Sequence, residues 1–276
     1  MELTVLGGSG LWPRAGQACS GYLLTHDDIR LLIDPGHGVL VELLRHCNAT
    51  DIDAVLISQG RPDHCADLGA LLRARVLGDD APSALPVVAP ENSLDALLAL
   101  DPAVPSDAVD QIRPPGSKIN FGPFAVEAVA LSADRSRFGF RITDPAGAVF
   151  VYAGESADDA ARVRLAHEAG LLVVEATYPD AIPASQARDH SDARQIGDLA
   201  LEADVDHCVI THLHPTADPI LALSLIRRTG FDAVEYALPG LVREVLPRPA
   251  ATGLPRRAAP KVITMTASAP RRAASQ

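Results

Sequence analysis

Hydrophobic residues recur along the chain with two periods, the two-residue period of strands and the longer period of helices. The first part of the chain shows mainly the strand period. Short apolar runs at residues 2–7, 20–25 and 30–36 are separated by Gly, Ser, Asp and Pro, which is typical of strands joined by turns. A helical pattern follows at residues 38–47. The opening segment therefore predicts hairpins that lead into a first helix.

The rest of the chain alternates between strand-like and helix-like segments. Strands are expected at residues 53–58, 85–90, 124–132, 138–144, 148–154, 171–178, 206–213, 233–238 and 241–245, and helices after Asp63 and at residues 92–100, 157–170, 191–203 and 218–230. Early hairpins followed by β-α alternation favour mixed sheets covered by helices, which is an α/β (α+β) architecture.

Composition places the chain among soluble proteins with a large core. It has 276 residues, of which 47% are hydrophobic. Its apolar runs are broken well short of the roughly 20 residues that span a bilayer, and its N-terminus has the pattern of a strand rather than a signal peptide. Its four cysteines form no C-x-x-C pair, which is typical of a reducing compartment. We therefore expect a cytoplasmic protein with no membrane partner.

Charge is unevenly distributed along the chain. The net charge is -11, yet residues 247–276 carry six basic residues and no acid, which leaves 18 basic and 35 acidic residues in the body. Such a body repels phosphate backbones. We expect residues 1–246 to form the folded domain and the Pro/Ala/Arg-rich residues 247–276 to form a disordered, solvated tail. A contact between the tail and an acidic partner is the less favoured alternative.

A glycine-rich stretch, "GGSGLWP" at residues 7–13, follows the first expected strand. A dinucleotide-binding loop would need a third glycine and the start of a helix, but Pro13 occupies that position. A tight turn explains the glycines better than phosphate binding does.

Acids and imidazoles follow several of the expected strands. Asp63 and His64 are adjacent and could both turn toward one cation, although Asp is also a favoured helix N-cap. The other such residues are Glu155, Glu175, His212 and His214. His214 would face the same way as His212 if the strand continued, but a surface position beyond the strand end is favoured. Several residues that share this placement indicate a site.

Ten stretches, taken in order, resemble the metallo-β-lactamase superfamily, in the branch of ribonuclease Z and its bacterial phosphodiesterase relatives. They are "LGGSG", "ACSGYLL", "LLIDPGHGVL" with Asp34, "SQGRPDHCADL", "FGFRITDPAG", "VYAGES", "VEATY", "HSDARQIGDLA", "THLHP" and "ALPGLVREV". The resemblance covers residues 1 to about 246. It implies a four-layer αβ/βα sandwich with its site at one edge.

By this resemblance, a first metal site would use three histidines. Gln59, Arg61 and Ala133 stand at those positions. Gln is a poor zinc ligand and Arg offers no lone pair, so the resemblance implies that no zinc binds there.

The resemblance preserves the second metal site. Asp63, His64 and His212 stand at ligand positions, and Glu155 replaces the family's Asp. One zinc ion at most is therefore expected at these four residues, and a metal-free pocket is the alternative. Each ligand change weakens metal binding, which favours that alternative.

Arg61 brings a fixed positive charge to the place of the missing dication. It could bind an anionic substrate, or it could form a salt bridge with Asp63 or Glu155, and the sequence favours the two roles equally. The resemblance also implies that Glu175 and His190 form an acid-base pair in which His190 protonates the leaving group. The alternative is that "HSDARQ" is merely a helix start, with Ser191 as its cap.

The leading functional hypothesis is a metal-dependent hydrolase of a small phosphodiester or a similar anionic ester, with Asp63 as ligand or base. The competing hypothesis is a metal-free, non-hydrolytic descendant, either a binding or regulatory protein or a biosynthetic enzyme in the old pocket. A tRNA substrate is not expected, because the short connections around "VYAGES" leave no room for the arm that grips tRNA. Relatives often dimerise, so a homodimer stays open.

Overall fold

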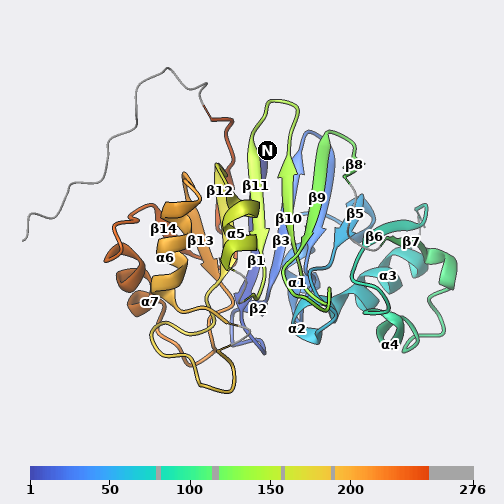
Figure 1. Ribbon diagram of the computed structural model, residues 1–276. Helices are drawn as coiled ribbons and strands as arrows, with labels where there is room; N and C mark the ends of the chain where they lie inside the picture. The colour runs from blue at the N-terminus through green and yellow to red at the C-terminus, as the bar shows by residue number, and fades with distance from the viewer. Residues whose placement is uncertain (79–81, 114–117, 157–158, 188–189, 249–276) are drawn as a thin grey trace, which may run out of the picture.

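The computed structural model describes residues 1–78, 82–113, 118–156, 159–187 and 190–248. In this part of the chain the strands form two sheets, one of eight strands and one of seven. Figure 1 shows the sheets side by side in the middle of the molecule, with helices on both outer sides.

The first sheet contains the N-terminal strands. Its members are β1 (Glu2–Ser9), β2 (Ala18–Cys19), β3 (Gly21–His26), β4 (Ile29–Ile33), β5 (Ala54–Leu56), β6 (Leu85–Val88), β7 (Val109–Arg113) and β15 (Val242–Glu244). Their order is β15-β1-β3-β4-β5-β6-β7, with β2 paired to β1. The pairs β1–β3 and β3–β4 are antiparallel, and β4 to β7 are parallel. Hairpins thus give way to parallel pairing, as the sequence pattern predicts.

The second sheet repeats this plan. Its members are β8 (Ile119–Phe121), β9 (Phe124–Ala130), β10 (Phe138–Thr143), β11 (Val149–Ala153), β12 (Leu171–Glu175), β13 (Cys208–Thr211) and β14 (Val234–Tyr236). Their order is β14-β13-β12-β11-β10-β9-β8, antiparallel from β8 to β11 and parallel from β11 to β14. The edge strands β7 and β8 lie where the sequence pattern gave no strand.

Helices cover the outer face of each sheet. Against the first sheet lie α1 (Val39–Leu43), α2 (Pro62–Cys65), α3 (Asp67–Leu77) and α4 (Asp95–Leu98), together with 3-10 turns at Ala49–Asp51 and Ser106–Ala108. Against the second lie α5 (Asp159–Ala166), α6 (Ala193–Glu202) and α7 (Pro219–Arg227) (Figure 1). No helix of the described residues is long and apolar enough to cross a membrane.

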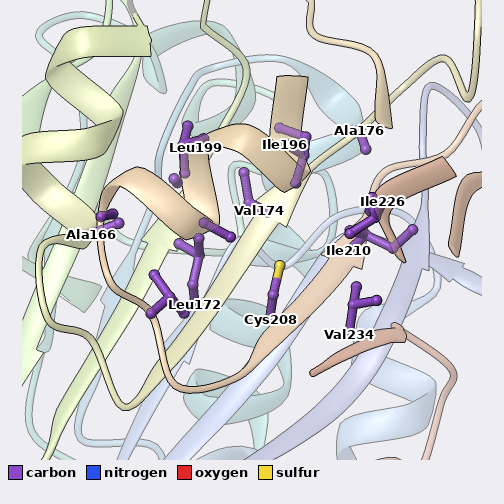
Figure 2. Close-up of a cluster of buried hydrophobic side chains, with 14 of the residues drawn as sticks. Ala166, Leu172, Val174, Ala176, Ile196, Leu199, Cys208, Ile210, Ile226 and Val234 are labelled. Atoms are coloured by element: carbon purple, nitrogen blue, oxygen red, sulfur yellow. The ribbon is translucent and has the colours of Figure 1, made fainter. Parts of the chain in front are cut away.

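Three hydrophobic cores separate the four layers. In β12, Leu171 and Val173 face the first sheet, whereas Leu172 and Val174 pack under α5 and α6. Figure 2 shows Leu172 and Val174 facing the helix that carries Ile196 and Leu199. This period-2 alternation lets one strand serve two cores. The expected four-layer αβ/βα sandwich is therefore the observed fold.

The start of the predicted tail is attached to the body. Pro247 pairs with Ala148, and the Arg248 guanidinium donates to Asp206 Oδ2 at 3.0 Å and to Asp204 Oδ2 at 2.9 Å. Residues 249–276, on which the prediction of a disordered tail mainly rests, lie outside the described residues.

Candidate functional site

The strand-end acids and imidazoles lie together at one edge of the sandwich. Asp34 follows β4, Glu155 follows β11, Glu175 ends β12 and His212 follows β13. The parallel strands of each sheet end at the same edge, so residues distant in sequence converge there. His64 reaches the same place from α2.

The backbone is specialised at this edge. Asp34 and His212 have φ angles of 46° and 57°, in the left-handed region that costs a non-glycine residue on the order of 1–3 kcal/mol. A Cβ at Gly10 would lie 2.4 Å from the His212 carbonyl oxygen, and one at Gly36 would lie 2.0 Å from the Asp63 carbonyl oxygen. Gly10 is therefore needed for close approach to the site as well as for a turn.

Asp34 is buried and accepts most of the hydrogen bonds on the side of the site that the first sheet forms. Its carboxylate accepts hydrogen bonds from Ser58 N at 2.6 Å and Ser58 Oγ at 2.5 Å, and from the Tyr152 hydroxyl at 2.7 Å. It also accepts from His64 Nδ1 at 2.8 Å. These contacts fix the orientation of the His64 ring, so that its Nε2 lies 2.8 Å from the Gln59 amide. Sequence reasoning missed the roles of Ser58 and Tyr152, since neither type is unusual near a strand end.

The neighbouring carboxylates favour the charged form of the His64 ring. Burial lowers its pKa, but the Glu175, Asp34 and Asp63 carboxylates outweigh burial and raise the pKa to about 10. An imidazolium donates through both nitrogens and offers no lone pair, so zinc binding through Nε2 would require His64 to lose one proton. Gln59 lies beside His64 Nε2, the nitrogen that would face a metal ion.

Arg61 bridges two buried acids. Its guanidinium donates to Glu155 Oε2 at 2.8 Å and to Asp63 Oδ2 at 3.1 Å. The Arg61 side chain is 39% exposed, while those of Asp63 and Glu155 are 4% and 1% exposed. The guanidinium thus lies between the acids and solvent. The salt bridge that the sequence offered as one role of Arg61 is present, with both acids at once; the role as an anion clamp stays a prediction.

His212 lies at the centre of the cluster. Its Nε2 is 3.0 Å from Asp63 Oδ2, and its Nδ1 is 3.7 Å from Glu155 Oε1. Its ring stacks on that of His64 with centroids 5.1 Å apart. Burial raises the pKa of Asp63, but the His212 hydrogen bond and the charges of His64, His212 and Arg61 lower it below its usual range. The four residues of the expected single-ion site are therefore neighbours, and three of them, Asp63, His64 and His212, offer ligand atoms within 4.8 Å of one another.

The cluster holds more negative than fixed positive charge. Among the described residues, Glu155 Oε1 and Glu175 Oε2 are buried and accept no hydrogen bond. Burial raises the pKa of Glu175, as do the charges of Glu155 and Asp34, and together they outweigh the opposing charges of His212 and His64. Buried carboxylate oxygens without a hydrogen bond are costly, so this geometry favours a cation or extra protons beside them.

His190 and Glu175 both lie in the site but contact different groups. His190 Nδ1 is 3.1 Å from Thr177 Oγ1 and 3.6 Å from Glu155 Oε1. Glu175 Oε1 lies 2.9 Å from the oxygen of the Tyr152 hydroxyl. The carboxylate beside His190 Nδ1 in these contacts is therefore Glu155. Thr177 also touches His212 Nδ1 at 3.2 Å and is a further residue that sequence reasoning missed.

Three other candidates lie at the margin of the site. His214 is half-buried and its Nδ1 is 2.8 Å from Thr216 Oγ1, in keeping with the favoured surface position. Ala133 is exposed in the loop before β10. The interpretation of Ser191 as a helix cap was wrong: Asp192 caps α6 and accepts from Gln195 N at 3.0 Å, because the helix begins one residue later.

The chain is similar to known proteins over most of its length. The family model of the β-lactamase superfamily domain matches residues 29–213. The probable metallo-hydrolase YhfI of Bacillus subtilis is 29% identical over 217 residues, which cover 77% of this chain and 87% of that protein. A ribonuclease Z of Kineococcus radiotolerans is 27% identical over 263 residues, covering 76% and 82% of the two chains.

Solved structures agree at the level of the fold. The crystal structure of YhfI from Bacillus subtilis superimposes with a TM-score of 0.77 at 25% identity, covering 88% of this chain and 99% of that one. A diphosphatase of the PhnP family superimposes with a TM-score of 0.70 at 18% identity, covering 88% and 96%. The second likeness shows the shared fold alone.

Proposed function

Because the chain belongs to the β-lactamase superfamily, in which its relatives include metallo-hydrolases, we propose that it hydrolyses a small anionic ester of the phosphodiester class with at most one metal ion. One observation carries the proposal: the Arg61 guanidinium joins Asp63 to Glu155, while His64 and His212 stay beside them. The name of one relative, ribonuclease Z, supports a phosphorus ester as the substrate class.

The residues fit one ion better than two. At the first position, Gln59, Arg61 and Ala133 provide no imidazole, and the guanidinium repels a dication. At the second, Asp63, His64, Glu155 and His212 would hold the ion with the mixed nitrogen and oxygen donors that zinc accepts. When bound, zinc would supply Lewis acidity and lower the pKa of a water molecule.

The chain's own residues supply binding and proton transfer. Arg61 is the part of the cluster open to solvent, and its planar donor set matches the oxygens of a phosphoryl group. Entry of such an anion would compete with Asp63 and Glu155 for the guanidinium. In this proposal His190, whose Nδ1 lies 3.1 Å from Thr177 Oγ1, gives a proton to the leaving oxygen.

A second candidate function has an observation of its own. The bridge from Asp63 through Arg61 to Glu155 already gives each acid a cationic partner without any ion. This favours a metal-free binding or regulatory protein, or a biosynthetic enzyme that uses the pocket differently.

Metal analysis of the purified native protein separates the two functions, with Asp63→Ala as the variant and Asp101→Ala, an acid paired with Arg73 on the surface, as the matched control. The hydrolase hypothesis expects about one zinc per chain, lost only in Asp63→Ala, together with hydrolysis of a bis-aryl phosphodiester. Metal-free protein, inactive even with added zinc, would rule out the hydrolase and leave the binding protein.

A further inference from the structure

Three aromatic rings lie against one another beside the site. The Trp12 and His214 rings meet edge to face with centroids 5.2 Å apart and planes at 83°. The Tyr178 and His214 rings stack with centroids 6.1 Å apart and planes at 22°. Trp12 is 48% exposed, so part of the indole stays open to solvent. We call these three residues the aromatic rim.

The loops that carry the rim are tied together by their backbones. Gly10 N donates to Leu213 O at 3.1 Å, and His214 N donates to Thr177 O at 2.9 Å. Trp12 N donates to Gly10 O at 2.7 Å. Loops that follow β1, β12 and β13 are thereby held in one arrangement. The rim is a preorganised surface, which lowers the entropy cost of binding a ligand to it.

The rim continues into the proposed catalytic cluster. The Tyr178 and His190 rings meet edge to face, with centroids 5.6 Å apart and planes at 82°. His190 Nδ1 lies 3.6 Å from Glu155 Oε1, and Glu155 accepts from Arg61. A ligand whose anionic group sits at Arg61 would therefore have the Tyr178 ring next to His190, the proposed proton donor.

Charge restricts the kind of ligand that can use this surface. The body of the chain carries 18 basic and 35 acidic residues, so it repels polyanions such as RNA. A small molecule with one planar ring and one anionic group meets less repulsion and still gains from stacking on Trp12.

We propose that Trp12, Tyr178 and His214 form a subsite for a planar aryl or heteroaryl group of the substrate. The inference rests on the proposed function and adds to it the class of leaving group. Trp12 provides the open stacking face, and Tyr178 joins it to His190. The enzyme then selects aryl or heteroaryl esters over alkyl esters of the same charge.

Trp12 is the one tryptophan of the sequence, so its fluorescence reports on the rim directly and without catalysis. The probes are 4-nitrophenylphosphonate and methylphosphonate, which share the anionic group and differ in the ring. Each is titrated into the full-length protein by calorimetry and by emission corrected for probe absorbance. We expect tighter binding of the aryl probe by at least about fivefold, with quenching of Trp12 only by that probe.

Variants separate stacking from folding. Trp12→Leu should bring the two probes to equal affinity, Trp12→Phe should keep part of the preference, and Leu100→Ala, at another exposed apolar residue, should keep all of it. Circular dichroism of each variant checks that the fold is retained.

Several outcomes would overturn the subsite. Equal binding of both probes, with unchanged Trp12 emission, would refute it and leave the proposed anion site intact. Failure of both probes to bind would refute the subsite and the anion site together. Emission that changes on dilution of the ligand-free protein would assign Trp12 to an interface between copies of the chain instead.

Discussion

Replacing Arg61 with methionine tests the central feature of the site, because methionine keeps much of the apolar stem and removes the charge. The change deletes the hydrogen bonds to Glu155 at 2.8 Å and to Asp63 at 3.1 Å. Hydrogen bonds to charged groups contribute about 1.5–3 kcal/mol each. The Arg61 side chain is 39% exposed, so solvent screening reduces each to about 1 kcal/mol. We expect a loss of about 2 kcal/mol in the free energy of unfolding.

Urea unfolding of metal-stripped protein, followed by circular dichroism, measures this loss. With a urea dependence of about 3 kcal/mol/M, the midpoint should fall by about 0.7 M. Arg73→Met is the matched control, because Arg73 pairs with Asp101 at 2.6 Å on an exposed surface, where a pair contributes at most about 1 kcal/mol. Added zinc should then stabilise Arg61→Met more than the native protein, since the ion can take over the charge of the guanidinium.

Two results would refute this reasoning. If Arg61→Met is as stable as the native protein in the presence of a chelator, the guanidinium does not neutralise Asp63 and Glu155. If zinc stabilises the native protein and the variant equally, Arg61 and the ion do not compete for the same acids.

Three further predictions concern other parts of the chain. Tyr152→Phe removes a hydroxyl that joins two buried carboxylates, and should lower the free energy of unfolding by about 2–3 kcal/mol; a loss below about 1 kcal/mol would contradict that role. Burial raises the pKa of the Cys65 thiol to about 12, so iodoacetamide at pH 8 should label half-buried Cys47 before Cys65 in the folded protein, and both cysteines equally in urea. Asp192→Ala removes the N-cap of α6 and should cost about 1 kcal/mol in urea unfolding, with unchanged metal content; an unchanged midpoint would show that the cap is dispensable.

The sequence predicted the fold well because hydrophobic segments with the strand period alternate along it with segments that have the helix period. Leu171 to Val174 are apolar at every position, the pattern of a strand buried on both faces, and that is their place between two cores. Edge strands β7 and β8 were missed, since β7 has the sequence VDQIR with three polar residues and β8 has only three residues. A strand buried between two cores has a long run of apolar residues in the sequence, whereas an edge strand has few apolar residues and is harder to predict.

The sequence predicted which residues lie together at this edge better than it predicted which of them contact one another. Asp63, His64, Glu155 and His212 stand at motif positions, so the resemblance could name them. Which acid faces which imidazole depends on side-chain directions that no sequence pattern encodes.

The hydrogen bonds of Tyr152 illustrate this limit. They depend on how close the two sheets lie, as well as on the strand positions themselves.

The mixed origin of the site has a consequence for how the protein assembles. Asp34 and Asp63 come from the half of the chain that builds the first sheet, whereas Tyr152, Glu155 and His212 come from the half that builds the second. Neither half alone contains a complete set of partners. The site can form only after the two halves have docked. An ion or anion that binds there would therefore bind the docked state alone and stabilise it against separation of the two sheets.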